Sequence, residues 1–223
     1  MTIHSYSAKQ IEAIKLRETL KIPGAHNVSN ALAALTAARM LKIPDDISLN
    51  ALSKFRGTWR RFEYRGEVNG AKIFDDYGHH PTEIRATLQG ARELMDSDKR
   101  LAISDGRLWC IFQPHQYQRT YKLFNEFVNT FDQADKLILL PIYSVAGREK
   151  ESIKKKVSSE KLAEVIRFKN YDLGIKNKNV LFSDSFDKAT DYLRKNLKQG
   201  DLAIIMGAGD IYKLTEMLLG GKV

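Results

Sequence analysis

Short apolar runs and longer periodic stretches alternate along this chain from residue 61 onward. Runs of this kind predict strands, and the stretches between them have the period of amphipathic helices. The predicted strands are Phe62–Val68, Ala71–Phe74, Leu108–Phe112, Lys136–Ile142, Asn179–Phe182 and Asp201–Met206. The predicted helices are Pro81–Met95, Arg119–Phe131, Ser159–Arg167, Phe186–Leu197 and Ile211–Leu219. Strands that alternate with helices indicate βαβ units, so we expect an α/β fold with a mostly parallel, Rossmann-like sheet and helices on both faces.

Two local signals refine this expectation. Asn69-Gly70 separates the first two predicted strands, and this dipeptide is the strongest short turn signal, so we expect an antiparallel hairpin there. The segment Asp96–Gly106 is polar and rich in turn residues. Its centre, Leu101–Ile103, is an alternative start for the strand that follows.

The first part of the chain predicts helices only. Asn27–Met40 is rich in alanine and has apolar residues on more than one side, which indicates a well-buried helix. A second helix is predicted over Ile47–Phe55, with Asp45 or Asp46 as its N-terminal cap.

Length and composition are those of an ordinary globular chain, with 223 residues of which 43% are hydrophobic and 28% charged. The change of pattern near residue 58 predicts two parts, 1–58 and 59–223. No apolar run approaches the roughly 18 residues of a membrane helix, and the first residues lack a signal-peptide pattern. The single cysteine, Cys110, lies in an apolar run, which favours a core position over a nucleophile. We therefore expect a cytoplasmic protein.

The net charge of the chain indicates which class of ligand it binds. A formal net charge of +9 and a pI near 9.5 favour anionic ligands such as nucleotides and phosphosugars. The basic residues form no stripe interleaved with aromatic residues, and no zinc-ligand spacing is present. We expect no nucleic-acid partner, no membrane partner and no metal held by this chain.

The richest chemistry lies in the segment Phe74–Ile84, F-D-D-Y-G-H-H-P-T-E-I. It spans the expected end of a strand and the start of a helix, which is where open α/β sheets bind ligands. Two acids, a tyrosine and two histidines at such a switch predict binding or catalysis. The alternative is a histidine-rich turn that only caps the helix.

A second polar segment follows another predicted strand and opens on the same edge of the sheet. Phe112–Thr120 reads F-Q-P-H-Q-Y-Q-R-T, and a histidine and an arginine there can bind a carboxylate. We expect the two loops to converge, so that Asp76 and His79 share one crevice with Arg119.

Two weaker groups of residues add to this picture. Asn27 and Asn30 are three apart, so they share one face of a helical turn and offer amides to a purine edge. The alternative is a helix cap plus a polar surface position. The segment Trp59–Phe62 contains tandem arginines that are suited to a phosphate clamp, or else to a surface ion pair.

Taken together, these segments resemble the Mur ligases, and most closely the members that join L-alanine to UDP-N-acetylmuramate. The matching strings begin at His26 (HNVSNALAA), Arg60 (RRFE), Asp75 (DDYGHHPTEI), Phe112 (FQPHxYxRT) and Met206 (MGAGDI). The resemblance implies ATP-dependent amide-bond formation through an acyl phosphate, in the synthesis of peptidoglycan precursors. It also implies ATP and Mg²⁺ as cofactors of the complete enzyme.

The resemblance carries site residues over by position. It implies adenine contacts for Asn27 and Asn30, a phosphate contact for Arg61, ribose bonds for Asp76, an alanine pocket lined by Tyr77 and His79, and carboxylate binding by Arg119 with His115. Arg61 and His79 are the implied catalytic residues. Gln116 stands where many relatives have an arginine, which leaves the carboxylate contact to Arg119.

The P-loop of this family, G-x-x-x-x-G-K-[ST], is not found in the 223 residues. We therefore expect residues 1–58 to be a remnant of the central ATPase domain, and the isolated chain to be inactive as a ligase. The missing amino-terminal half would carry the UDP-binding domain. Alternatives are a binding module without chemistry, a subunit that complements a separate amino-terminal half, a truncated gene product, and a murein tripeptide recycling ligase.

Overall fold

The computed structural model describes residues 11–97, 105–147, 149–174 and 179–221. By its internal contacts the chain divides into two compact units, Met1–Thr58 and Trp59–Val223. The alternative strand start at Leu101–Ile103 lies outside the described residues. Among those that are described, no helix combines the length and apolar character needed to cross a membrane.

The described residues of the first unit, from Ile11 onward, form a cluster of three helices. They are α1 (Ile11–Thr19), α2 (Ala25–Met40) and α3 (Asp45–Lys54). Its small core consists of Ala13, Leu16, Val28, Ala31 and Leu32. Helix α1 was not predicted, because its apolar positions do not line one face: Leu16 is buried whereas Ile14 is 63% exposed.

The prediction that Asp45 or Asp46 caps α3 is wrong. Pro44 is the cap residue, and both acids lie in the first turn of the helix. Their carboxylates still favour that position, because the helix dipole is positive at its amino-terminal end.

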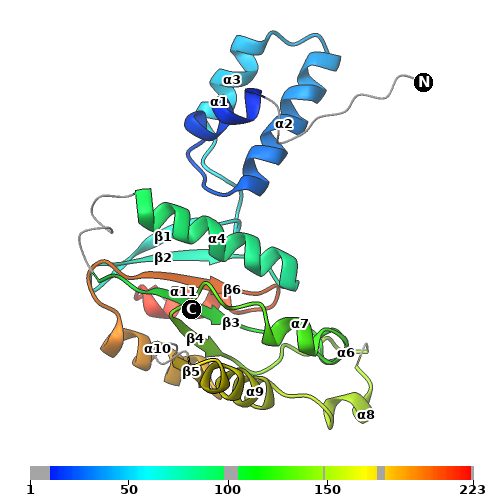
Figure 1. The fold of residues 1–223 in the computed structure, drawn as a ribbon, viewed down its shortest axis with the longest axis vertical. Coiled ribbons are helices and arrows are strands. Elements are labelled where there is room, and N and C mark those ends of the chain that lie inside the picture. The colour runs from blue at the N-terminus through cyan, green and yellow to red at the C-terminus, as the bar shows by residue number, and fades with distance from the viewer. Residues whose placement is uncertain (1–10, 98–104, 148, 175–178, 222–223) are drawn as a thin grey trace. The chain divides into compact units, whose positions relative to one another are not determined.

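A six-stranded sheet forms the second unit (Figure 1). Its strands are β1 (Glu63–Val68), β2 (Ala71–Asp76), β3 (Leu108–Phe112), β4 (Lys136–Leu139), β5 (Asn179–Phe182) and β6 (Leu202–Met206). Their order is β1-β2-β6-β3-β4-β5, and of the pairs between these described strands only β1–β2 is antiparallel. The expected hairpin is confirmed, since Asn69 and Gly70 both take positive φ (53° and 78°) and Val68 pairs with Ala71.

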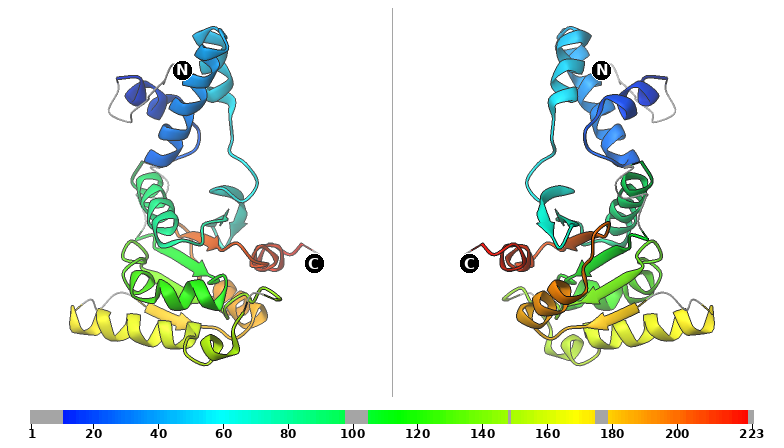
Figure 2. Two further views of the ribbon diagram at one scale, coloured as in Figure 1. Left: turned by 90° about the vertical axis from the view of Figure 1, so that its right-hand side faces the viewer. Right: turned by 90° about the vertical axis from the view of Figure 1, so that its left-hand side faces the viewer.

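Helices cover both faces of this sheet, as the sequence predicts (Figure 2). The helices described in this unit are α4 (Pro81–Ser97), α6 (Tyr117–Lys122), α7 (Phe124–Val128), α8 (Glu151–Lys154), α9 (Ser159–Asp172), α10 (Phe186–Asn196) and α11 (Tyr212–Leu218). Buried side chains of α4, α7 and α9 pack on one face, and those of α10 and α11 pack on the other. Successive side chains of strand β3 point to opposite faces, so that Cys110 packs in the core on one face and Trp109 in the core on the other.

The single helix predicted over Arg119–Phe131 is instead two short helices, α6 and α7. Leu123 lies between them with φ −103° and ψ 17°, outside helical geometry. Helix α6 starts earlier than expected, after Gln116, whose φ is 71°. Strand β4 ends at Leu139 rather than Ile142, although the amide of Leu140 still donates to the carbonyl of Phe112 at 2.9 Å.

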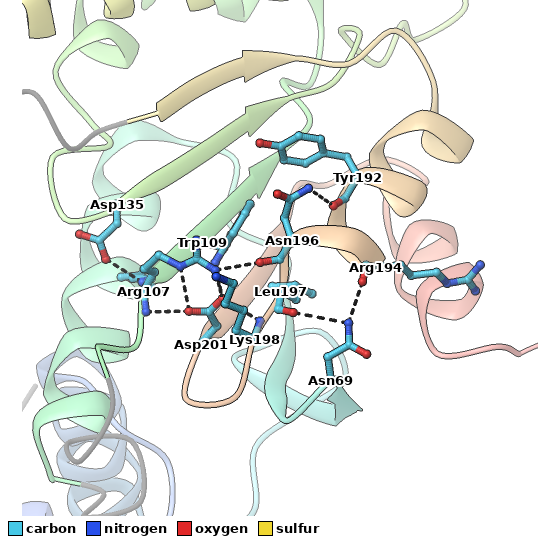
Figure 3. Close-up of polar contacts among 11 residues, drawn as sticks. Asn69, Arg107, Trp109, Asp135, Tyr192, Arg194, Asn196, Leu197, Lys198 and Asp201 are labelled. Atoms are coloured by element: carbon cyan, nitrogen blue, oxygen red, sulfur yellow. Dashed lines mark hydrogen bonds and ion pairs between the residues drawn. The ribbon is translucent and has the colours of Figure 1, made fainter.

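At the amino-terminal ends of β3 and β6, Asp201 connects several segments of the chain through hydrogen bonds (Figure 3). Its carboxylate accepts hydrogen bonds from the backbone and side chain of Arg107, from Trp109 Nε1 at 2.9 Å and from the amide of Lys198. Asn69 in the β1–β2 turn donates to the carbonyl of Arg194 at 2.7 Å. These contacts hold the amino-terminal ends of the strands together. The loops described below leave the sheet at the carboxyl-terminal ends of the strands.

Candidate functional site

Loops from β2, β6, β3 and β4 leave the sheet at one edge, because these four strands run parallel. The predicted loops after β2 and β3 are therefore on the same edge. They do not follow adjacent strands, however, because β6 lies between β2 and β3. The loop Gly207–Asp210 after β6 is thus part of the same region, and the sequence reasoning assigned it no site residue.

A continuous series of side-chain contacts joins the two predicted loops. The ring centroids of Tyr77 and His79 are 5.7 Å apart, and those of His79 and His115 are 5.9 Å apart. The ring of His115 stacks on Tyr143 at 5.3 Å. Arg119 Nη1 lies 3.3 Å from His115 Nδ1, with the proton position set by the histidine tautomer. The structure therefore brings together four of the predicted residues, from Tyr77 to Arg119.

The two arginines of the Trp59–Phe62 segment differ sharply. Arg60 is 1% exposed, and its guanidinium donates to the carbonyls of Gly207 and Gly209. Arg61 is exposed, and its guanidinium carbon lies 5.4 Å from the centroid of the Tyr77 ring. A clamp made from both arginines is excluded by this burial, so only Arg61 is accessible to an anionic ligand.

Asp76 is buried beneath the first loop, with both carboxylate oxygens hydrogen-bonded. Oδ2 accepts from the amide of Phe62 at 2.9 Å, while Oδ1 accepts from the amide of Gly78 at 2.7 Å and from the hydroxyl of Thr87 at 3.2 Å. Burial raises the pKa of the carboxyl, although these bonds and the charge of Arg61 act in the opposite direction. These contacts shape the loop, and nothing in them adds support for the predicted ribose bond.

The neighbouring acid, Asp75, points to the other face of the sheet. It pairs with Arg65 at 2.6 Å and accepts a hydrogen bond from Thr215 of α11. Burial raises the pKa of this carboxyl too, against the effects of the Thr215 bond and the Arg65 charge. The two acids of the D-D pair therefore lie on opposite faces of β2, as the alternation of a strand requires.

Part of the first loop is a helix cap. One carboxylate oxygen of Glu83 accepts from the amides of His79 and His80 at 2.9 and 3.1 Å. Burial opposes ionisation, but these two bonds outweigh it and lower the pKa of Glu83. The capping alternative is thus correct for Glu83, while the His79 ring remains available to contact Tyr77 and His115.

The loop after β6 packs closely against its neighbours. A Cβ placed on Gly209 would come within 2.6 Å of the Tyr143 ring and 2.8 Å of Gln113 Oε1. The side-chain amide of Gln113 donates to Asp210 at 3.2 Å. The string M-G-A-G-D-I was the available signal for this loop, since paired glycines after a strand often mark close backbone approach.

The predicted adenine-binding residues lie in the first unit. Asn27 is half-buried and donates from Nδ2 to the carbonyl of Pro23 at 2.6 Å, while Asn30 is exposed. Gly24 is the cap residue of α2, so Asn27 is not the cap. The adenine contact stays a prediction.

The described residues do not offer a metal centre. No group of three or more histidine, cysteine or acidic side chains among them is arranged to hold an ion. This finding concerns clusters of three or more such ligands, whereas Mg²⁺ in nucleotide sites is usually held by one or two carboxylates together with phosphates. Cys110 is fully buried, and burial raises the pKa of its thiol well above the usual range, as expected for a core residue.

Comparison with known proteins identifies the family of this chain. Residues 60–209 match the family described as Mur ligase, glutamate ligase domain. The chain belongs to the Mur ligase family. Curated relatives of this Mur ligase chain include the UDP-N-acetylmuramate–L-alanine ligases of Clostridium novyi, 43% identical over 92% of this chain and 40% of the relative, and of Lachnospira eligens, 45% identical over 90% and 39%. The chain thus spans about 40% of the length of the curated relatives it matches.

Solved structures agree with this assignment. The UDP-N-acetylmuramate–alanine ligase of Thermotoga maritima superposes with a TM-score of 0.68 at 26% identity, over 90% of this Mur ligase chain and 38% of that one. A murein peptide ligase of Psychrobacter arcticus superposes with a TM-score of 0.59 at 29% identity, again over 90% and 38%.

Proposed function

We propose that this chain is the carboxyl-terminal portion of a UDP-N-acetylmuramate–L-alanine ligase, in which it binds the amino acid and contacts the nucleotide. The observation that carries the proposal is the contact series Tyr77–His79–His115–Arg119 across two loops. It sits at the sheet edge where α/β folds bind ligands. The names of the relatives supply the substrate class.

In this proposal Arg119 binds the carboxylate of L-alanine and His115 orients the guanidinium. A guanidinium can donate two parallel hydrogen bonds to a carboxylate, which fixes the direction of the amino acid. The rings of Tyr77 and His79 form the wall beside it and limit the size of the side chain. Gln116 is next to the start of α6, and as a neutral residue it leaves the charge at this position to Arg119.

The reaction proposed for the complete enzyme is amide-bond formation. ATP phosphorylates the carboxylate of UDP-N-acetylmuramate, and the amine of alanine attacks the acyl phosphate with loss of phosphate. The amine must reach the acyl carbon unprotonated, and holding both groups in place supplies much of the rate. Arg61, exposed at the edge of the site, would stabilise phosphate charge, and His79 would line the approach of the amine.

The nucleotide contacts complete the proposal. Asn27 and Asn30 would hold adenine, and Asp76 would contact ribose through the lone pairs that its internal hydrogen bonds leave open. Residues 1–58 would be the last helices of the central ATPase domain. ATP and Mg²⁺ would be bound mainly by the P-loop part of the enzyme, because that motif is not found in this sequence. The cytoplasmic location is part of the same proposal.

A coupled assay of ADP release tests this function. The 223-residue chain alone, with UDP-N-acetylmuramate, L-alanine, ATP and Mg²⁺, is expected to give no turnover above the blank. Mixed with the amino-terminal part of an alanine-adding relative, it is expected to give alanine-dependent ADP release. Turnover by the chain alone would refute the first expectation, and a mixture without alanine dependence would refute the assignment.

Arg119→Ala is the sharper test of the site. It removes a charge-assisted hydrogen bond worth roughly 1.5–3 kcal/mol, which corresponds to about a 10- to 100-fold rise in KM for L-alanine. Arg167→Ala, an exposed arginine of α9, is the matched control and should leave KM unchanged. An unaltered KM in Arg119→Ala would rule out the carboxylate role.

A murein peptide ligase is the second candidate, because such a ligase from Psychrobacter arcticus shares the fold at 29% identity. The same mixture, offered L-alanine or a murein tripeptide as the amine substrate, separates the two. Preference for the tripeptide would select the recycling reaction.

A further inference from the structure

Arg60 occupies the junction between three parts of the site. Its guanidinium donates to the carbonyls of Gly207 and Gly209 in the loop after β6, the second of these at 3.1 Å. Its own carbonyl accepts from the amide of Tyr77 at 2.7 Å. One residue thus connects the start of the second unit, the loop after β2 and the loop after β6.

Aromatic rings surround this buried cation. The guanidinium carbon lies 5.7 Å from the Trp59 ring centroid and 5.4 Å from those of Tyr77 and Tyr212. Rings at such distances attract a cation through their electron-rich faces, and the attraction grows when water is excluded. Because Arg60 is 1% exposed, it cannot itself meet a ligand without leaving this enclosure.

The backbone around Arg60 is held in an uncommon conformation. Arg60 has φ 51° and Phe62 has φ 49°, both in the left-handed region that side chains other than glycine seldom adopt. Glu63 accepts from the amide of Arg60 at 2.8 Å, and Asp76 accepts from the amide of Phe62 at 2.9 Å. These contacts hold the intervening residue, Arg61, at the surface of the site.

Tyr77 connects this junction to both halves of the proposed site. Its ring lies 5.4 Å from the guanidinium carbons of both Arg60 and Arg61. On the amino-acid side it contacts His79 with ring centroids 5.7 Å apart. A displaced Arg60 would therefore disturb the phosphate-side Arg61 and the alanine-side His79 together.

We propose that Arg60 is a positioning residue that locks the loops after β2 and β6 to the Trp59–Phe62 segment, and so aligns Arg61 and Tyr77 for the ligase reaction. Its effect on catalysis rests on the proposed function, whereas its effect on the loops does not. The geometry requires a forked donor, since two separate carbonyls are bridged while the planar group packs among rings. A lysine has one compact ammonium group and cannot reproduce this arrangement.

Amide hydrogen exchange of the 223-residue chain directly tests whether Arg60 holds the loops after β2 and β6 in place. Arg60→Met and Arg60→Lys are expected to speed exchange of the Tyr77 and Gly207 amides by at least about 10-fold, since local opening depends on these contacts. The exchange rate of the Lys72 amide should be unchanged, because this amide lies at the far end of β2, where it donates to the backbone carbonyl of Asp201 at 2.9 Å. Arg92→Met is the matched control, because that half-buried guanidinium, which also pairs with Asp135, donates two hydrogen bonds to a backbone carbonyl, that of Gln133.

Kinetics of the reconstituted ligase give the second readout. Arg61→Met should raise KM for ATP and lower kcat but leave KM for L-alanine unchanged, whereas both Arg60 variants should lower kcat and raise KM for ATP and for L-alanine together. Full rescue by Arg60→Lys would overturn the bridging geometry. Effects equal to those of Arg61→Met, with KM for L-alanine unchanged, would make Arg60 a phosphate ligand instead.

The exchange experiment separates failure of this inference from failure of the proposed function. If the wild-type mixture shows no alanine-dependent turnover, the proposed function fails, while faster exchange in the Arg60 variants still supports the lock. Unchanged exchange at Tyr77 and Gly207 in both variants would overturn the inference. If Arg60→Met does not fold, the same criterion is applied to Arg60→Lys, which keeps the charge and the length of the side chain.

Discussion

At the scale of single residues, the buried acid Asp201 holds together segments at the amino-terminal ends of β3 and β6. Its side chain is 2% exposed and pairs with Arg107 at 2.7 Å while accepting from Trp109. Asp201→Asn keeps the shape but removes the charge and replaces an acceptor by a donor. We expect the free energy of unfolding to fall by about 3–5 kcal/mol.

Urea unfolding followed by circular dichroism measures this change. The matched control is Asp184→Asn, which breaks an exposed pair with Lys188 and should not change the free energy of unfolding measurably. Equal losses in the two variants would mean that Asp201 acts no differently from a surface acid.

Asp76 gives a prediction for the pH dependence of stability. Burial raises the pKa of its carboxyl above the usual value of about 3.8. At pH values between 3.8 and the pKa in the folded state, the folded protein therefore binds more protons than the unfolded chain does. The free energy of unfolding contributed by Asp76 therefore falls as pH rises through this window. Asp76→Asn should flatten that decline, and Asp75, whose pKa is also raised, should preserve part of it.

Urea titrations at a series of pH values from about 4 upward test this sign. The control is Asp184→Asn, because a hydrogen bond from Lys188 lowers the pKa of that carboxyl and its removal cannot flatten the decline. A slope in Asp76→Asn equal to that of the wild type would contradict the assignment of the raised pKa to Asp76.

At the scale of elements, sequence periodicity predicted the strands and most helices, because buried strands such as Leu108–Phe112 are continuous apolar runs. It failed where tertiary contacts decide the outcome. The break between α6 and α7 at Leu123 has no glycine or proline to announce it. Helix α1 was missed because its burial depends on packing against α2 rather than on a regular apolar face.

The loops of the candidate site could be predicted from the sequence, but their arrangement could not. The loops after β2 and β3 could be located from polar residues at strand ends, and the structure brings their side chains together. The order of the strands, with β6 in between, is a property of chain topology that local sequence does not encode. The different burial of Arg60 and Arg61 also follows from long-range contacts with Gly207 and Gly209.

The close packing of the β6–α11 loop gives an element-scale prediction. In Gly209→Ala the new Cβ would meet the Tyr143 ring at 2.6 Å, so ring or loop must move. Overpacking of this kind costs about 1–3 kcal/mol, and displacement of Tyr143 would disturb the ring stacked on it, His115. Thermal unfolding and the NMR shifts of His115 measure both effects.

Gly220→Ala is the control for that experiment. Gly220 has φ 79° and no atom within 4 Å of an added Cβ, so alanine there meets backbone strain of roughly 1 kcal/mol without a clash. The His115 shifts should move in Gly209→Ala only. Unmoved shifts in both variants would show that the loop accommodates the methyl group without reaching the site.

At the scale of the whole molecule, several large apolar side chains of the first unit are exposed to solvent. Ile14, Met40, Leu41 and Ile47 are 63%, 56%, 74% and 57% exposed, and no residue of α3 is buried. Exposed apolar side chains mark an interaction surface where they lie together. If residues 1–58 are part of the central ATPase domain, as proposed, these side chains should pack against the P-loop part of the ligase.

Binding of the chain to that amino-terminal part, measured by titration calorimetry, tests this packing. Burying one such side chain contributes about 1.5–3 kcal/mol, so Leu41→Asp or Ile47→Asp should weaken Kd by at least about 10-fold. Tyr171→Asp, in the second unit at 83% exposure, should leave Kd unchanged and controls for loss of exposed apolar area in general. If all three variants bind as the wild type does, the apolar surface of the first unit is not the contact, and residues 1–58 join the ligase in some other way.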